Sequence, residues 1–257
     1  EIPDKELDIE FKRFKGQKMH VLELFDTDSL LVKQFFKDCE TILDGINKVL
    51  TAIKYPLDWR KNPTDFHYYQ AFKVNPFKCK CTFVNFDDYW QTAPETIWLG
   101  YGDRQGDERL IIFHPPAPQC EDTTTLMHTY FLSKNIDCFW VAGAVYKGDT
   151  LLGGHAFEIA FLENHYRLVE TTLERPIKSL NVLPIVNIDE TVWRIGDLTY
   201  LGIIAIRKRE EIWINNKFMV FSQRIVDLLN TCKIFGKKVG LKEREVIRNE
   251  FIKLGIV

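Results

Sequence analysis

Apolar residues recur with a helical period in four long stretches of the chain. These stretches are 27–53, 120–131, 222–236 and 242–254. Asp28 or Ser29 is available as the N-cap of the first stretch. A shorter helix is predicted after Thr92, because Pro94 suits a first helical turn and Gly100 suits a helix end. The pattern therefore predicts helices near both ends of the chain and in its middle.

Alternating apolar positions predict an antiparallel sheet after the helix that begins at Cys120. The expected strands are Cys138–Tyr146, Gly153–Leu162, His165–Thr172, Leu198–Ile206 and Glu211–Phe221, with further short strands at 79–86 and 110–113. A helix followed by antiparallel strands is typical of an α+β fold in which the helix packs across the sheet. We expect a helical N-terminal extension at 1–60, a core at 61–221 and a helical C-terminal segment at 222–257.

The composition is that of a globular protein: of 257 residues, 46% are hydrophobic and 27% are charged. The formal net charge of −2 gives no electrostatic reason to expect nucleic acid or an anionic membrane as a partner. No apolar run approaches the ~20 residues that a membrane span needs. The six cysteines are too scattered for a disulfide framework, and Cys79 and Cys81 are expected to be strand residues rather than metal ligands. Because the chain begins at Glu1 without a methionine, we expect a processed or trimmed product.

Cys120 stands at the start of a predicted helix and is the candidate nucleophile. The apolar face of this helix is formed by Leu126, Met127, Tyr130 and Phe131. Glu121 and Asp122 suit the positive end of the helix dipole. A thiol at a helix N-terminus has a lowered pKa, because the dipole and the free N–H groups favour the thiolate. The alternative is a small buried core cysteine, so a nucleophile also requires a base and an orienting group.

His155 is the first candidate for the base. It lies 35 residues after Cys120 on a predicted strand, behind two glycines that allow a substrate to come close. A histidine on an apolar strand face is either a satisfied core residue or the base of a Cys–His pair. The other two histidines considered, His128 and His165, are interpreted as structural or exposed.

Glu170 is the candidate that orients His155. In the hairpin that turns at Glu163-Asn164, residues 157 and 170 face each other. Glu170 is then a diagonal neighbour of His155, at ~7–8 Å between backbones. A carboxylate buried in a strand is costly unless it is paired, and His155 would pair it. Glu158 points to the opposite face by alternation.

Three motifs together resemble the transglutaminase-like cysteine peptidases. They are Cys120-Glu121-Asp122 at a helix start, Gly154-His155-Ala156 on a strand and Val169-Glu170-Thr171-Thr172 on the next strand. The stretch 88–96, followed by Gly100–Asp103, is similar to the segment before the nucleophile in bacterial LapG-type proteinases. The resemblance spans roughly 85–172 and implies a papain-like, transglutaminase-like core with a Cys-His-Glu triad.

The chain departs from that family just before the nucleophile. Residues 104–119 stand as an insertion between Asp103 and Cys120, and Gln119 occupies a position where the family has aspartate. In the family, that aspartate and the glutamate after the cysteine are implicated in calcium binding. We therefore expect no cofactor, with calcium at Glu121 and Asp122 as the alternative that the resemblance offers.

The resemblance implies a thiol hydrolase that cleaves a peptide or isopeptide bond through a thioester acyl-enzyme. The backbone N–H of Cys120 and one side chain would hold the oxyanion, and Gln91 and Trp90 are both candidates for that side chain. Protein-glutamine acyl transfer and a catalytically silent binding protein on the same fold are the alternatives. The expected partner is a protein or peptide substrate, and the sequence predicts neither the oligomeric state nor the compartment.

Overall fold

The structure is a computed structural model that describes residues 10–12, 18–53, 91–100, 120–209, 211–214 and 239–257. The strands expected at 79–86 and 110–113, the helix expected at 222–236, and Trp90 lie outside the described residues.

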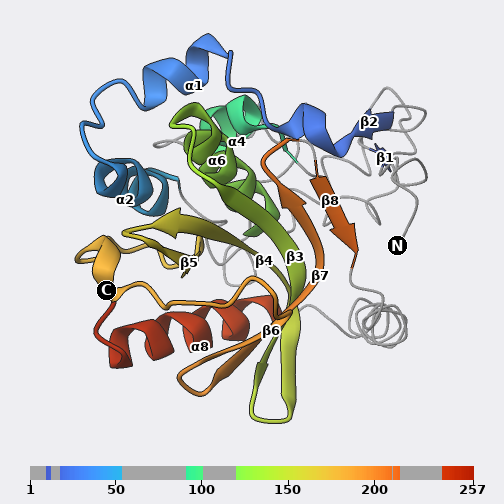
Figure 1. The fold of residues 1–257 in the computed structure, drawn as a ribbon, viewed down its shortest axis with the longest axis vertical. Coiled ribbons are helices and arrows are strands. Elements are labelled where there is room, and N and C mark those ends of the chain that lie inside the picture. Colours follow the sequence, from blue (N-terminus) through green and yellow to red (C-terminus); the bar gives the residue numbers. More distant parts are fainter. Residues whose placement is uncertain (1–9, 13–17, 54–90, 101–119, 210, 215–238) are drawn as a thin grey trace, which may run out of the picture.

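The centre of the molecule is an antiparallel sheet with strand order β5-β4-β3-β7-β6 (Figure 1). Its strands are β3 (Cys138–Lys147), β4 (Thr150–Leu162), β5 (His165–Val169), β6 (Val192–Ile195), β7 (Leu198–Arg207) and β8 (Glu211–Ile214). One edge of β7 pairs with β3, and its other edge pairs first with β6 and then with β8. A separate pair, β1 (Glu10–Lys12) and β2 (Lys18–His20), forms in the charged, weakly patterned N-terminal part.

The strands after the central helix follow the predicted pattern closely. The expected hairpin register is confirmed, because Glu158 pairs with Val169 and Leu162 pairs with His165. Two predictions about strands were wrong. β5 ends at Val169 rather than Thr172, since the Glu170 carboxylate, rather than a neighbouring strand, accepts the backbone N–H of Thr172. β6 was missed, because four residues carry too little alternation to stand out.

The helices are α1 (Leu30–Phe35), α2 (Ile42–Ala52), α4 (Ala93–Gly100), α6 (Cys120–Ser133) and α8 (Val239–Lys253), with short 3-10 turns at Val21–Leu24 and Leu180–Val182. The single helix expected over 27–53 is wrong. Thr41 and Asp44 form a capping box that starts a new helix, with each side chain accepting the other's backbone N–H. Ser29 is the N-cap residue of α1, but its side chain makes no capping bond. The short helix after Thr92 is confirmed, and Thr92 and Glu95 bond each other in the same reciprocal way.

The central helix α6 is buried on all sides along 122–131, although the pattern predicted one apolar face. It packs across β3 and β4, and α2 and α4 cover its other sides (Figure 1). Threonines can be buried here because their hydroxyls bond carbonyls one turn earlier: Thr124 to Cys120, Thr125 to Glu121 and Thr129 to Thr125. A helix that is polar in sequence is thereby accommodated within the core.

Helices from both ends of the chain pack into the same core as the sheet. Ile46 and Val49 of α2 lie in one cluster with Tyr130 of α6, and Phe251 of α8 joins Phe157 of β4 there. The fold is therefore α+β, a mixture of helices with an antiparallel sheet. None of the described helices is long and apolar enough to cross a membrane.

Candidate active site

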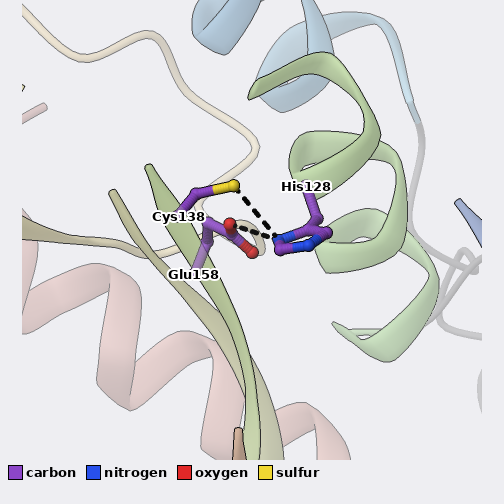
Figure 2. Close-up of side chains that lie close together, drawn as sticks. All are labelled: His128, Cys138 and Glu158. Carbon is purple, nitrogen blue, oxygen red and sulfur yellow. Dashed lines mark hydrogen bonds and ion pairs between the residues drawn. The ribbon is translucent and has the colours of Figure 1, made fainter. Parts of the chain in front are cut away.

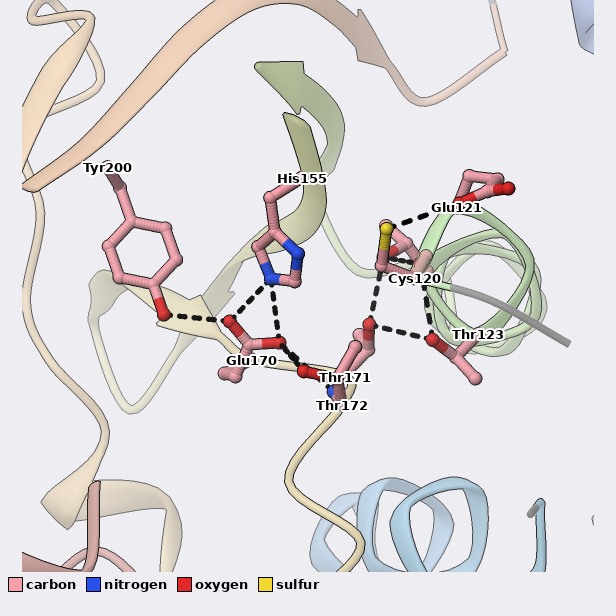
Figure 3. Close-up of polar contacts among 9 residues, drawn as sticks. Cys120, Glu121, Thr123, His155, Glu170, Thr171, Thr172 and Tyr200 are labelled. Carbon is pink, nitrogen blue, oxygen red and sulfur yellow. Dashed lines mark hydrogen bonds and ion pairs between the residues drawn. The ribbon is translucent and has the colours of Figure 1, made fainter. Parts of the chain in front are cut away.

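The expected base and orienting group meet directly. Nε2 of His155 lies 3.0 and 2.8 Å from the two carboxylate oxygens of Glu170 (Figure 3). Both side chains are buried. Because a carboxylate only accepts hydrogen bonds, Nε2 carries the proton, and the lone pair of the neutral ring is on Nδ1. The pairing predicted from the hairpin register is present, although Glu170 lies one residue beyond the end of β5.

Further donors surround the Glu170 carboxylate. The Tyr200 hydroxyl donates to one oxygen at 2.7 Å, and the backbone N–H and hydroxyl of Thr172 donate to the other at 3.0 and 2.7 Å. Burial by itself raises the pKa of Glu170, but the charge of His155 and these hydrogen bonds outweigh it, so the pKa is lowered from its ordinary 4.5. The carboxylate is thus held ionised in a fully buried position.

The lowered pKa predicts acid sensitivity that depends on this one residue. Because Glu170 has a lower pKa in the folded chain, its stabilising contribution is complete above about pH 4.5 and is lost as the pH falls through the folded pKa. We expect the urea midpoint of the wild-type protein to fall more between pH 6 and pH 3 than that of Glu170→Gln. Other carboxylates titrate in both proteins, so the difference between the two isolates Glu170. Parallel curves would contradict the assignment.

The residue after Glu170 ties this pair to the start of α6. The Thr171 hydroxyl lies 3.0 Å from the Thr123 hydroxyl and 2.9 Å from the Thr124 hydroxyl. Both of these also donate to the carbonyl of Cys120, at 3.1 and 2.6 Å. Glu170 therefore binds His155, and the next residue, Thr171, lies against the first turn of α6.

Cys120 is the first residue of α6 and is partly exposed, unlike the buried Cys39 and Cys138. In Figure 3 the imidazole of His155 lies between Glu170 and Cys120, and its Nδ1 edge faces the Cys120 side. The thiol donates a hydrogen bond to the Glu121 carboxylate at 3.2 Å. From the sequence, Glu121 is expected only to favour the helix dipole or to bind calcium, and nothing in the sequence predicts this contact between neighbouring residues.

Gln91, one of the two oxyanion candidates, is held against α6. Its backbone N–H donates to Asp122 at 2.7 Å, and both residues are buried. This bond joins the segment that leads into α4 to the first turn of α6. This contact uses one oxygen of Asp122, so fewer lone pairs of that carboxylate are left for a calcium ion. The other oxyanion candidate, Trp90, and the insertion 104–119 lie outside the described residues.

The contacts of two further residues of the site, Tyr200 and Thr171, are not predicted from the sequence. Tyr200 is expected only as a strand residue, and Thr171 only as a strand residue in the motif around Glu170, without a contact of its own. Tyr200 reaches Glu170 from β7, and pairing between strands so far apart in the chain leaves no local signal. The two other histidines considered are located as interpreted: His165 is exposed, and His128 is buried against Glu158, which points away from His155 as expected.

Comparisons of the chain with protein-family models, with curated proteins and with solved structures give no significant match. The resemblance to transglutaminase-like peptidases therefore rests on the residues themselves.

Proposed function

We propose that the chain is a cysteine peptidase or amidase of the transglutaminase-like type, with Cys120 as nucleophile, His155 as base and Glu170 as the group that orients the base. The observation that carries the proposal is the buried His155–Glu170 pair, linked through Thr171 to the helix turn that begins with Cys120. A buried ionised carboxylate is costly to maintain unless it is hydrogen-bonded. It is understandable where a histidine must be kept in one tautomer and orientation.

The reaction is acyl transfer. Nδ1 of His155 takes the thiol proton of Cys120 as sulfur attacks the amide carbonyl, and it returns the proton to the leaving amine. Glu170 keeps Nε2 protonated and stabilises the imidazolium. Water then attacks the thioester, again assisted by His155, and releases the acid. The Cys120 backbone N–H, in the first residue of α6, suits the oxyanion, with Gln91 as the side-chain candidate.

The contact between Cys120 and Glu121 favours a second candidate, a binding protein that keeps this fold without catalysis. A carboxylate 3.2 Å from the sulfur repels the negative charge of a thiolate. Catalysis requires Glu121 to turn away, so that the thiol proton can pass to His155.

The test is selective alkylation combined with activity on labelled casein. We expect a fluorescent iodoacetamide to label Cys120 at least tenfold faster than any other cysteine, and His155→Ala to slow this labelling about 100-fold. Cys39→Ser is the matched control, because burial raises the pKa of Cys39 and its loss should change nothing.

The same preparation separates the candidates. Casein cleavage that is lost in Cys120→Ser supports hydrolysis, whereas incorporation of a dansyl-labelled amine into casein supports the acyltransferase alternative. If neither the wild-type protein nor Glu121→Gln is labelled at Cys120, the catalytic proposal is overturned in favour of the binding protein.

A further inference from the structure

A second group of chemically active side chains lies on the opposite face of the sheet from His155. Nδ1 of His128, on α6, is 2.8 Å from Glu158 Oε1 and 3.5 Å from Cys138 Sγ (Figure 2). Cys138 and Glu158 belong to the paired strands β3 and β4. They share a face, because Cys138 pairs with Ala160, which is two residues from Glu158. All three residues are buried, and their ligand atoms lie within 4.8 Å of one another.

The contact on the other side of the His128 ring fixes the tautomer of the neutral ring. Nε2 lies 2.7 Å from the Lys208 carbonyl, which can only accept, so Nε2 carries the proton. The Lys208 carbonyl is held in place because its backbone adopts φ 51° and its N–H donates to the Cys138 carbonyl. In neutral His128 the Nδ1 lone pair therefore points at a carboxylate and a sulfur. Three electron-pair donors converge on one point, and a histidine braced by a carbonyl on its other nitrogen is the usual arrangement of a metal ligand.

The Glu158 carboxyl supplies an independent observation. Its Oε2 is fully buried and has no hydrogen-bond partner among the described residues. An unpaired buried carboxyl oxygen costs free energy unless something binds it. Phe25 packs on the His128 ring, with centroids 4.4 Å apart, and closes the group off from water.

We infer that His128, Cys138 and Glu158 form a structural zinc site. A thiolate, a carboxylate and a neutral imidazole carry two negative charges, which balance one Zn²⁺ ion in a buried place. A mixed nitrogen, sulfur and oxygen set suits zinc better than the oxygen-seeking calcium or magnesium. The unpaired Oε2 of Glu158 is the fourth ligand, with the carboxylate binding through both oxygens.

The distances fit this assignment. With Zn–S of about 2.3 Å, Zn–N of about 2.0 Å and a near-tetrahedral angle between these two bonds, the sulfur and the nitrogen are about 3.5 Å apart. That is the separation of Cys138 Sγ and His128 Nδ1, 3.5 Å. The nitrogen and oxygen, at 2.8 Å, must open by about half an ångström to admit the ion. Zinc here fastens the middle of α6 to the two central strands, while the candidate active site lies at the start of the same helix.

The experiment uses the full chain without a metal-binding tag. Because the site is closed, the protein is unfolded with a chelator, refolded with one equivalent of Zn²⁺ and desalted before its metal content is measured. We expect one zinc per chain in the wild-type protein, and less than about a tenth of this in Cys138→Ser and Glu158→Gln. Refolding with Co²⁺ should give a thiolate-to-metal charge-transfer band that is absent in Cys138→Ser.

Two controls address the competing thiol sites. Cys120→Ser removes the other Cys-His-Glu group, and Cys79→Ser/Cys81→Ser removes the close cysteine pair; both should keep full zinc. A variant that retains Cys138 as its only cysteine should keep the cobalt band, which tests the site even if Cys138→Ser does not fold. A wild-type chain that retains no zinc, or zinc that is lost with Cys120 or with Cys79 and Cys81, overturns the inference.

Discussion

Glu170→Gln is expected to lower kcat for hydrolysis about 10³-fold while the protein stays folded. Glutamine has nearly the same shape, so the contacts with Tyr200 and Thr172 can be kept in part. It carries no charge, however, and its amide can present N–H to Nε2 of His155, which would then lose its proton to Nδ1. The base would be in the wrong tautomer, and the imidazolium of the transition state would lose its partner. Loss of the orienting carboxylate in comparable triads costs up to about 10⁴-fold.

The measurement is kcat on labelled casein, with circular dichroism and the thermal midpoint as checks of folding. Glu170→Asp keeps the charge and shortens the reach, so it should retain more activity than Glu170→Gln. Tyr200→Phe is the matched control: it removes one hydrogen bond to the same carboxylate and should cost less than about tenfold. A folded Glu170→Gln protein with kcat within threefold of wild type would contradict the role given to Glu170.

The parts of this site that depend on local periodicity can be predicted from the sequence. Alternation along the hairpin is enough to place Glu170 opposite residue 157 and to turn Glu158 the other way, and the structure confirms the register. The helix that begins at Cys120 is likewise visible from its apolar positions and from the acidic residues in its first turn. These features need only the repeat of a strand or a helix and one turn.

Contacts between elements that are distant in the chain cannot be predicted from this pattern. His128 was interpreted as structural or exposed because it lies two turns from Cys120. Nothing in the pattern indicates that α6 lies on the Glu158 face of the sheet, or that Lys208 brings a carbonyl to its ring. The break between α1 and α2 was missed for a related reason, because an apolar stripe can continue through a capping box without showing it. Such contacts are set by how whole elements pack.

Gly143→Ala is expected to destabilise the fold by about 4 kcal/mol or more, which is exceptional for the addition of one methyl group. A Cβ at this position would lie 1.6 Å from the backbone carbonyl oxygen of Leu201, and a backbone atom cannot turn aside as a side chain can. Gly143 lies at the irregularity where β3 meets β7, and it faces His155 on β4. The close approach of β7 to β3 therefore occurs at the level of the candidate base.

The consequence reaches the site through Tyr200, which precedes Leu201 on β7 and donates to Glu170. To admit the methyl group β7 must move away from β3, and Tyr200 must move with it. We expect the urea midpoint of Gly143→Ala to fall far more than that of Gly148→Ala, an exposed turn position with φ 56° and nothing within 4 Å, where strain alone costs about 1–2 kcal/mol. An equal fall of the urea midpoint in the two variants would mean that the sheet can move apart at Gly143 at little cost in stability. The close packing of β3 and β7 would then not be what holds Tyr200 against Glu170.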